Sequence, residues 1–154
     1  MTHKHFFLLL LALPCLFGCG ERLPFDVIVV TGTVTVDGQP MEGISITFIP
    51  LGDNGLAAFD VTDAQGRFRL SSPQAPVGSG AVPGEYAPTF SKMEVEEHPP
   101  TASPEEAQRL YGNAPPKITH LIPERYGNAK TSGIEPVKVE KGKKNAFSFD
   151  LSTK

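Results

Sequence analysis

Tryptophan is absent from this chain of 154 residues, and cysteine occurs only twice, at Cys15 and Cys19. The absence of tryptophan argues against a dedicated platform for stacking sugar rings. Both cysteines lie within the first 19 residues, so the rest of the chain has no pair of thiols for a disulfide. The 136 residues from Cys19 onward are nevertheless enough for one domain with a core of its own, because a chain of that size buries about two-thirds of its unfolded surface.

An excess of positive charge is also lacking. The chain has 14 basic and 17 acidic residues, and one of the basic residues, Lys4, lies in the first 18 residues. The overall negative charge argues against nucleic acid as a partner, and against an anionic membrane surface as one.

No hydrophobic run is long enough to span a bilayer, which requires about 20 apolar residues. The longest run covers residues 6–17 and follows Lys4 near the N-terminus. A positive segment followed by about a dozen apolar residues is typical of a secretory signal. We therefore expect residues 1–18 to be a signal peptide that is removed on export.

The end of this run resembles the lipobox of bacterial lipoproteins, with the segment Leu16, Phe17, Gly18 and Cys19. The resemblance implies cleavage after Gly18 and attachment of diacylglycerol to the thiol of Cys19, as the only cofactor-like group. Gly20 follows the cysteine where an aspartate often retains lipoproteins at the inner membrane, so the resemblance implies a cell-envelope protein held at the outer membrane. The alternatives are an ordinary cleaved signal peptide and lipidation at Cys15, which the preceding Pro14 disfavours.

Beyond a tether at residues 19–26, alternating and β-branched segments predict seven strands. They cover residues 27–36, 44–49, 57–62, 67–71, 84–90, 133–139 and 145–151. Short strands separated by frequent turn signals are typical of a β-sandwich. We expect an all-β, seven-stranded antiparallel sandwich over residues 27–151.

A long polar segment at residues 93–130 interrupts the strands, and we expect it to be a loop insertion with one short helix at about 104–111. Ser103 and Glu106 form a capping box, Pro104 occupies the first helical position, and Gly112 ends the helix. So short a helix is stable only if it docks, and Leu110 and Tyr111 are the side chains that we expect to dock it.

Three segments together resemble the carboxypeptidase regulatory-like, transthyretin-like domains that occur in many bacterial lipoproteins, notably planctomycete ones. They are Val30-x-Gly32-x-Val34-x-x-Asp37-Gly38-x-Pro40, Thr62-Asp63-x-x-Gly66-x-Phe68-x-Leu70 and Val82-Pro83-Gly84-Glu85-Tyr86. The resemblance implies a transthyretin-like topology without catalytic residues. Transthyretin-like hydrolases of 5-hydroxyisourate end in Tyr-Arg-Gly-Ser, and this chain does not.

Catalytic and metal-binding patterns are not evident. Asp60 and Asp63 lack the oxygen-rich loop that calcium requires, and His98 and His120 have no cysteine partners for zinc. The Gly-x-Ser-x-Gly elbow of serine hydrolases does not occur. We therefore expect no enzyme activity, no metal and no cofactor beyond the covalent lipid.

Two features could form a binding surface. Lys141, Lys143 and Lys144 cluster in one turn, and the alternative is that this turn is simply solvated. Tyr111 and Tyr126 are candidate contacts in the long loop. The loop could instead be a lid over a sheet edge. The sequence predicts a non-catalytic envelope module with a structural or protein-binding role. The alternatives are a carbohydrate-binding or substrate-capture lipoprotein and an accessory subunit of a hydrolase.

Overall fold

The computed structural model describes residues 25–53, 55–96, 103–112 and 114–154. Within these ranges the regular secondary structure is mostly β-strand, with one α-helix and one 3-10 helix. No helix in the described ranges is long and apolar enough to cross a membrane. In chain order the elements are β1 Val30–Val36, β2 Gln39–Pro40, β3 Ser45–Pro50, β4 Ala58–Val61, β5 Arg67–Arg69, β6 Gly84–Ser91, β7 Met93–Glu96, α1 Pro104–Tyr111, β8 Lys117–His120, η1 Glu124–Gly127, β9 Val137–Val139 and β10 Asn145–Leu151.

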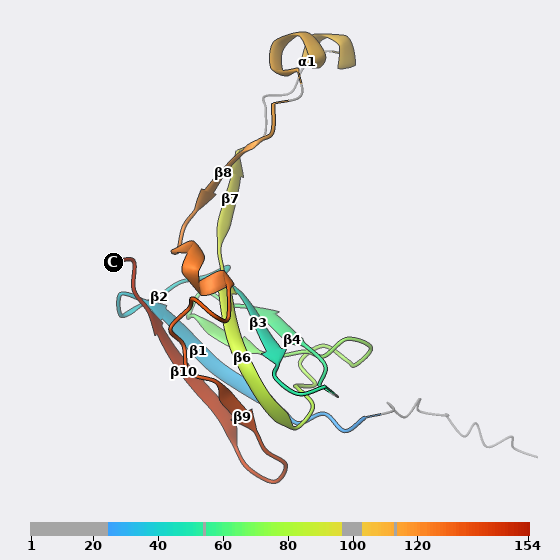
Figure 1. The fold of residues 1–154 in the computed structure, drawn as a ribbon, viewed down its shortest axis with the longest axis vertical. Helices are drawn as coiled ribbons and strands as arrows, with labels where there is room; N and C mark the ends of the chain where they lie inside the picture. The colour runs from blue at the N-terminus through green and yellow to red at the C-terminus, as the bar shows by residue number, and fades with distance from the viewer. Residues whose placement is uncertain (1–24, 54, 97–102, 113) are drawn as a thin grey trace, which may run out of the picture.

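Two four-stranded sheets form the body of the molecule (Figure 1). In the first sheet β1 lies next to β10 and also pairs with β2 and β5; the second sheet has the order β4-β3-β6-β9. The two sheets face each other across an apolar core. The ring of Phe48 on β3 lies 6.3 Å from that of Phe68 on β5 and 5.9 Å and 6.2 Å from those of Phe147 and Phe149 on β10, measured between ring centres. This two-layer arrangement confirms the all-β prediction.

One pair of strands corrects the expectation of a wholly antiparallel fold. β1 and β10 run parallel, in a continuous register from Val30 opposite Asn145 to Val36 opposite Leu151. These strands come from opposite ends of the domain, so no hairpin forces them into an antiparallel pair. The seven expected strands are all present, and β2, β7 and β8 are additional.

Gly32 lies in the middle of β1, and a glycine inside a strand often marks a bulge or a close backbone approach. The register with β10 runs through Gly32 without a bulge. A Cβ atom at this position would lie 2.2 Å from the carbonyl oxygen of Phe147 and 2.5 Å from the ring of Phe68. The glycine is therefore required by close packing against two neighbouring strands.

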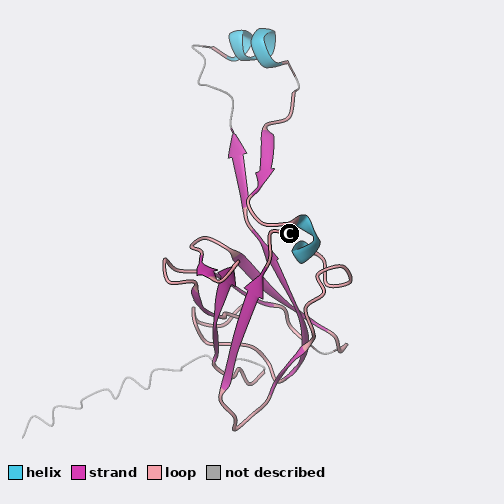
Figure 2. Ribbon diagram, turned by 90° about the vertical axis from the view of Figure 1, so that its left-hand side faces the viewer, coloured by secondary structure: helices cyan, strands magenta, loops and turns pink. Residues whose placement is uncertain are grey.

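Residues 93–130 differ most from the expectation of a loop insertion. β7 and β8 form a separate two-stranded antiparallel sheet that runs away from the body, and α1 lies beyond its far end (Figures 1 and 2). The chain closes at the base of this sheet, where the N–H of Leu121 donates to the carbonyl of Lys92 over 2.9 Å. We call the described residues 93–96, 103–112 and 114–120 the arm.

The helix within the arm has the predicted bounds, Pro104–Tyr111, and the predicted cap. The Ser103 hydroxyl accepts a hydrogen bond from the N–H of Glu106 over 3.2 Å, and Gly112 ends the helix with a φ of 57°. The expected docking is wrong, because α1 buries none of its residues and Leu110 is 56% exposed.

Candidate functional site

The lipobox residues Leu16, Phe17, Gly18 and Cys19 lie outside the described residues, as does most of the tether. The structure therefore places none of them, and lipidation of Cys19 stays a prediction. The described chain begins at Phe25, just before the strands of the body.

The arm carries one apolar face and one polar face. Val95 lies opposite Ile118, and Met93 lies opposite His120, and directly opposed residues share a face of the ribbon. Glu94 opposite Thr119 and Glu96 opposite Lys117 form the other face. Alternation along two short strands thus places three large apolar side chains together.

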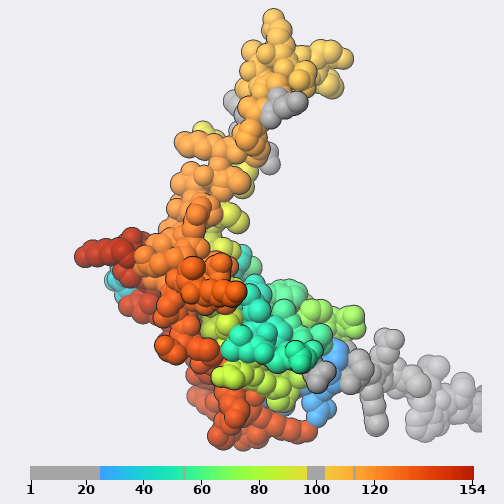
Figure 3. Space-filling model, in the orientation of Figure 1, coloured from blue at the N-terminus to red at the C-terminus, as the bar shows by residue number. Residues whose placement is uncertain are grey.

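The apolar face is open to solvent. Met93, Val95 and Ile118 are 53%, 51% and 53% exposed, and every residue of β7 and β8 is exposed. The space-filling view shows the arm standing clear of the body (Figure 3). Neither β7 nor β8 pairs with a second described strand on its outer edge. The arm therefore offers both an apolar face and free backbone groups.

The polar face holds a cross-strand ion pair. The ammonium of Lys117 lies 3.3 Å from a carboxylate oxygen of Glu96. At the base of the arm, Nε2 of His120 lies 2.7 Å from a carboxylate oxygen of Glu124. Both pairs are largely solvent-exposed, so they orient the strands more than they stabilise the fold.

The two tyrosines proposed as loop contacts occupy different environments. Tyr111 is the last residue of α1 and is partly exposed in the arm. Tyr126 on η1 is 5% exposed, and its hydroxyl accepts from the N–H of Ser152 over 2.9 Å and donates to the Ser152 carbonyl over 3.2 Å. With no free face, Tyr126 does not belong to the contact surface that we consider below.

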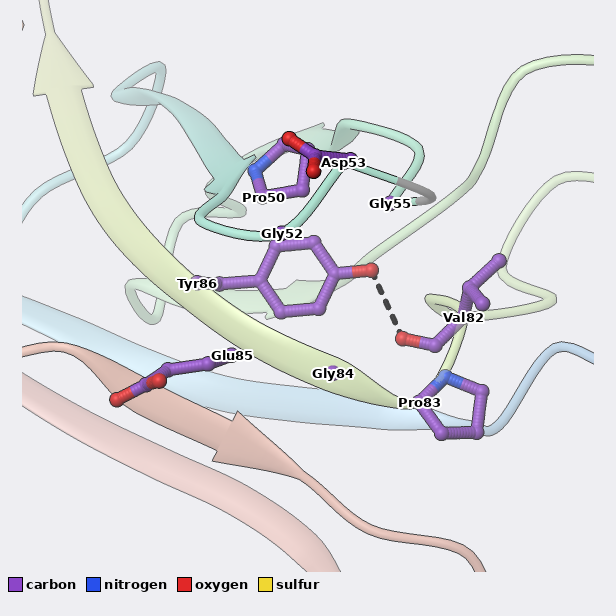
Figure 4. A pocket seen from close by; sticks show the side chains of 9 residues that line it. All are labelled: Pro50, Gly52, Asp53, Gly55, Val82, Pro83, Gly84, Glu85 and Tyr86. Carbon is purple, nitrogen blue, oxygen red and sulfur yellow. Dashed lines mark hydrogen bonds between the residues drawn. The ribbon is translucent and has the colours of Figure 1, made fainter.

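A hollow of about 320 Å³ lies between the β3–β4 connection and the start of β6 (Figure 4). Its lining consists of Pro50, Gly52, Asp53, Gly55, Val82, Pro83, Gly84, Glu85 and Tyr86. The Tyr86 hydroxyl donates to the Val82 carbonyl over 2.8 Å, and burial raises the pKa of this phenol, so it stays protonated at neutral pH. In Figure 4 the carboxylates of Asp53 and Glu85 lie on opposite sides of the Tyr86 ring and do not converge as an acid–base pair.

The two aspartates considered for calcium instead accept hydrogen bonds from backbone N–H groups. Asp63 accepts from the N–H groups of Gln65 and Arg67, both over 2.9 Å, and Asp60 accepts from the N–H of Arg69 over 2.5 Å. In the ranges that the structure covers, no three His, Cys, Asp or Glu residues are grouped so as to hold a metal ion. His98 lies outside those ranges.

Sequence reasoning missed the apolar face of the arm. The signal is present as two alternating stretches, Met93-Glu94-Val95-Glu96 and Lys117-Ile118-Thr119-His120. Each is only four residues long and at least half of its residues are charged or polar, so the pattern predicts a polar loop.

Comparison with known proteins gives little. No family model matches the chain, and no curated protein matches its sequence. Among solved structures it is similar to part of a 9R-lipoxygenase from Cyanothece PCC8801, with a TM-score of 0.36 and 14% identity over 82% of this chain and 16% of the enzyme. The chain thus spans about a sixth of that enzyme's length, and a likeness at this level assigns it neither a family nor an activity.

Proposed function

We propose that this chain is a lipid-anchored, non-catalytic module of the cell envelope that binds another envelope protein through its arm. In this proposal residues 27–151 form a transthyretin-like sandwich, and Cys19 carries the lipid. The observation that carries the binding role is the exposed apolar face of Met93, Val95 and Ile118.

The energetics of an isolated ribbon support this role. Two strands alone are marginally stable in water, and large apolar side chains on a projecting element are costly to leave solvated. Full burial of such a side chain contributes about 1.5–3 kcal/mol, so covering three half-exposed ones gains roughly 1 kcal/mol each. A protein surface that covers this face would therefore stabilise the arm and the complex together.

The carbohydrate-binding alternative has less support. It depended on Tyr111 and Tyr126 as stacking side chains, and the ring of Tyr126 is part of the core. Glycan binding is therefore an outcome that the experiments below can return, not the function that we favour.

Site-specific photo-crosslinking tests the binding role. A photoreactive amino acid replaces Val95 on the apolar face or Thr119 on the polar face, in cells that express the full chain. We expect a discrete crosslinked protein band from position 95 and a much weaker one from position 119, because both positions lie on the same ribbon and differ only in face.

Equal crosslinking from both faces would indicate random encounter and would contradict the proposal. Polysaccharide in place of protein in the position-95 product would favour the carbohydrate-binding alternative. The second variant pair, Val95→Glu and Thr119→Glu, provides a check: only the first should abolish co-purification with the crosslinked protein.

The anchor is tested separately. We expect the mature wild-type protein to begin at an acylated Cys19 by intact-mass measurement, and to partition into the detergent phase of Triton X-114. Cys19→Ser and globomycin treatment should each remove the acyl mass and the partition. A mature N-terminus at any other residue would contradict the lipidation of Cys19.

A further inference from the structure

The turn between β9 and β10 carries a local positive charge that the overall composition hides. Lys138, Lys141, Lys143 and Lys144 lie within seven residues, while the whole chain has a net charge of −3. Glu140 is the one acidic residue among residues 138–144. All three lysines of the turn itself, at positions 141, 143 and 144, are exposed.

The ion pairs at this turn leave a surplus of positive charge. Glu140 faces two lysines, with Lys143 at 2.5 Å and Lys138 at 3.7 Å. Asp26 lies 2.7 Å from Lys141. Among the described residues no carboxylate lies within ion-pair distance of Lys144. Four ammonium groups thus face two carboxylates.

The partner of Lys141 shows that this turn lies next to the start of the described chain. Asp26 is the second described residue of the chain and lies seven residues after Cys19. A chain rises at most about 3.6 Å per residue, so seven residues reach no more than about 25 Å. A lipid on Cys19 would therefore hold the lysine turn close to the bilayer.

The arm lies at the other end of the body. In Figure 1 the β9–β10 turn is at the bottom of the view, the start of the described chain is at the lower right of the body, and the arm projects from the top. The C-terminus lies on the same side of the body as the base of the arm. The positive end is thus the end from which the tether leaves.

We infer that the lysine turn, residues 138–144, docks the anchored domain on an anionic phospholipid surface. This inference rests on the proposed lipidation of Cys19. The occupant follows from charge complementarity and from the short tether: anionic headgroups are the negative surface that the tether brings within reach. Each lysine near such a surface favours contact by about fivefold, so losing three should shift the domain largely to the undocked state.

The absence of tryptophan allows a clean test. Val29 is 46% exposed and lies three residues from Asp26, so Val29→Trp places a single fluorescent reporter at the proposed contact. The acylated full-length mature protein is reconstituted in vesicles of phosphatidylcholine, with or without one quarter phosphatidylglycerol. A nitroxide-labelled headgroup lipid then quenches tryptophan only on contact.

We expect strong quenching of Val29→Trp in the phosphatidylglycerol vesicles and weak quenching in pure phosphatidylcholine. Quenching should be lost when Lys141, Lys143 and Lys144 become glutamine, and in about 1 M salt, where the Debye length falls to about 3 Å. The matched control changes Lys117, Lys130 and Lys154 to glutamine and should leave quenching intact. Val95→Trp in the arm should stay unquenched throughout.

Each other outcome overturns the inference. Equal quenching in both vesicles, or quenching that survives loss of the three turn lysines, means that the tether alone brings the domain to the membrane. No quenching of an acylated, vesicle-bound protein means that the domain stands off the surface. If mass measurement finds no acyl group, the proposed anchor fails; the same assay on the unacylated protein then decides, and an unquenched Val29→Trp overturns docking.

Discussion

At the residue scale, several polar side chains near turns hold the end of the chain to the body. The carboxylate of Asp37 accepts from the N–H of Thr153 over 3.2 Å. Arg125 donates to the carbonyls of Ser152 and Lys154 over 2.9 Å and 2.8 Å. These contacts hold residues 152–154, which follow the end of β10 and belong to no strand.

Tyr126→Phe should destabilise the fold by about 1–3 kcal/mol. The substitution keeps the buried ring but removes the hydroxyl that pairs with both the N–H and the carbonyl of Ser152. Urea denaturation measures the change. Val77→Ala, at a side chain that is 97% exposed, is the control and should change stability by less than about 0.5 kcal/mol. Equal stability of the two variants would contradict a stabilising role for the hydrogen bonds between Tyr126 and Ser152.

Gly32→Ala should be far more destabilising than Gly52→Ala. The added methyl group at Gly32 meets the backbone oxygen of Phe147, which cannot move aside, and we expect a loss of about 3 kcal/mol or more. No atom of the residues that the structure describes lies within 4 Å of a Cβ at Gly52, so that variant should keep or slightly exceed the wild-type stability. Thermal unfolding distinguishes them, and matched melting temperatures would refute the close-packing account.

At the element scale, the strands that the sequence predicted are those that face the core. Ile46 and Phe48 on β3 are buried between exposed or partly exposed neighbours, so period-two alternation reports both the strand and its inner face. Pro88 lacks the N–H that a strand ladder needs, so a proline inside a strand favours a position without a neighbour on that side. β9 pairs only with Gly84–Tyr86, so Pro88 lies where β6 pairs with β3 alone among the described strands.

The arm could not be predicted in the same way. The capping box predicts where α1 begins, and Gly112 predicts where it ends, because both signals depend only on local hydrogen bonds and backbone conformation. Docking of Leu110 depends on a distant surface, about which local sequence carries no information. Likewise, alternation over four residues shows that β7 has two unlike faces, but not that the body leaves both of them uncovered.

Hydrogen exchange should separate the arm from the body. We expect amides of β7 and β8 to exchange orders of magnitude faster than those of β3 and β6, because the ribbon opens locally without exposing the core. The measurement is mass-resolved deuterium uptake of the purified protein. Comparable protection in the two regions at low concentration would contradict an uncovered arm, and protection that appears only at high concentration would show pairing between copies.

At the scale of the whole molecule, the arm and the lysine turn lie at opposite ends of one body of two packed sheets (Figure 1). A chain anchored through Cys19 would therefore hold its apolar ribbon away from the bilayer, where it meets other envelope proteins. Orientation matters here because an apolar arm facing the lipid would bury itself there. The proposed docking of the lysine turn and the proposed binding role of the ribbon are thus compatible in one orientation.

Acid should weaken the fold as a whole. A backbone hydrogen bond from Arg67 lowers the pKa of Asp63, and a hydrogen bond from the Thr153 hydroxyl lowers that of Asp37. The ammonium of Lys141 lowers the pKa of Asp26 in the same way. Since each folded pKa lies below the ordinary aspartate value of 3.8, these contributions are complete above it and are lost as the pH falls through the folded values.

The urea midpoint should therefore be level from about pH 7 to 5 and should fall steadily below about pH 4. Asp63→Asn keeps an oxygen that can accept from the backbone but never titrates, so it should flatten this fall. Asp53→Asn, in the exposed β3–β4 connection, should leave the slope of the wild type unchanged. A midpoint that holds or rises on acidification, or identical slopes for the two variants, would show that the turn aspartates do not link stability to pH.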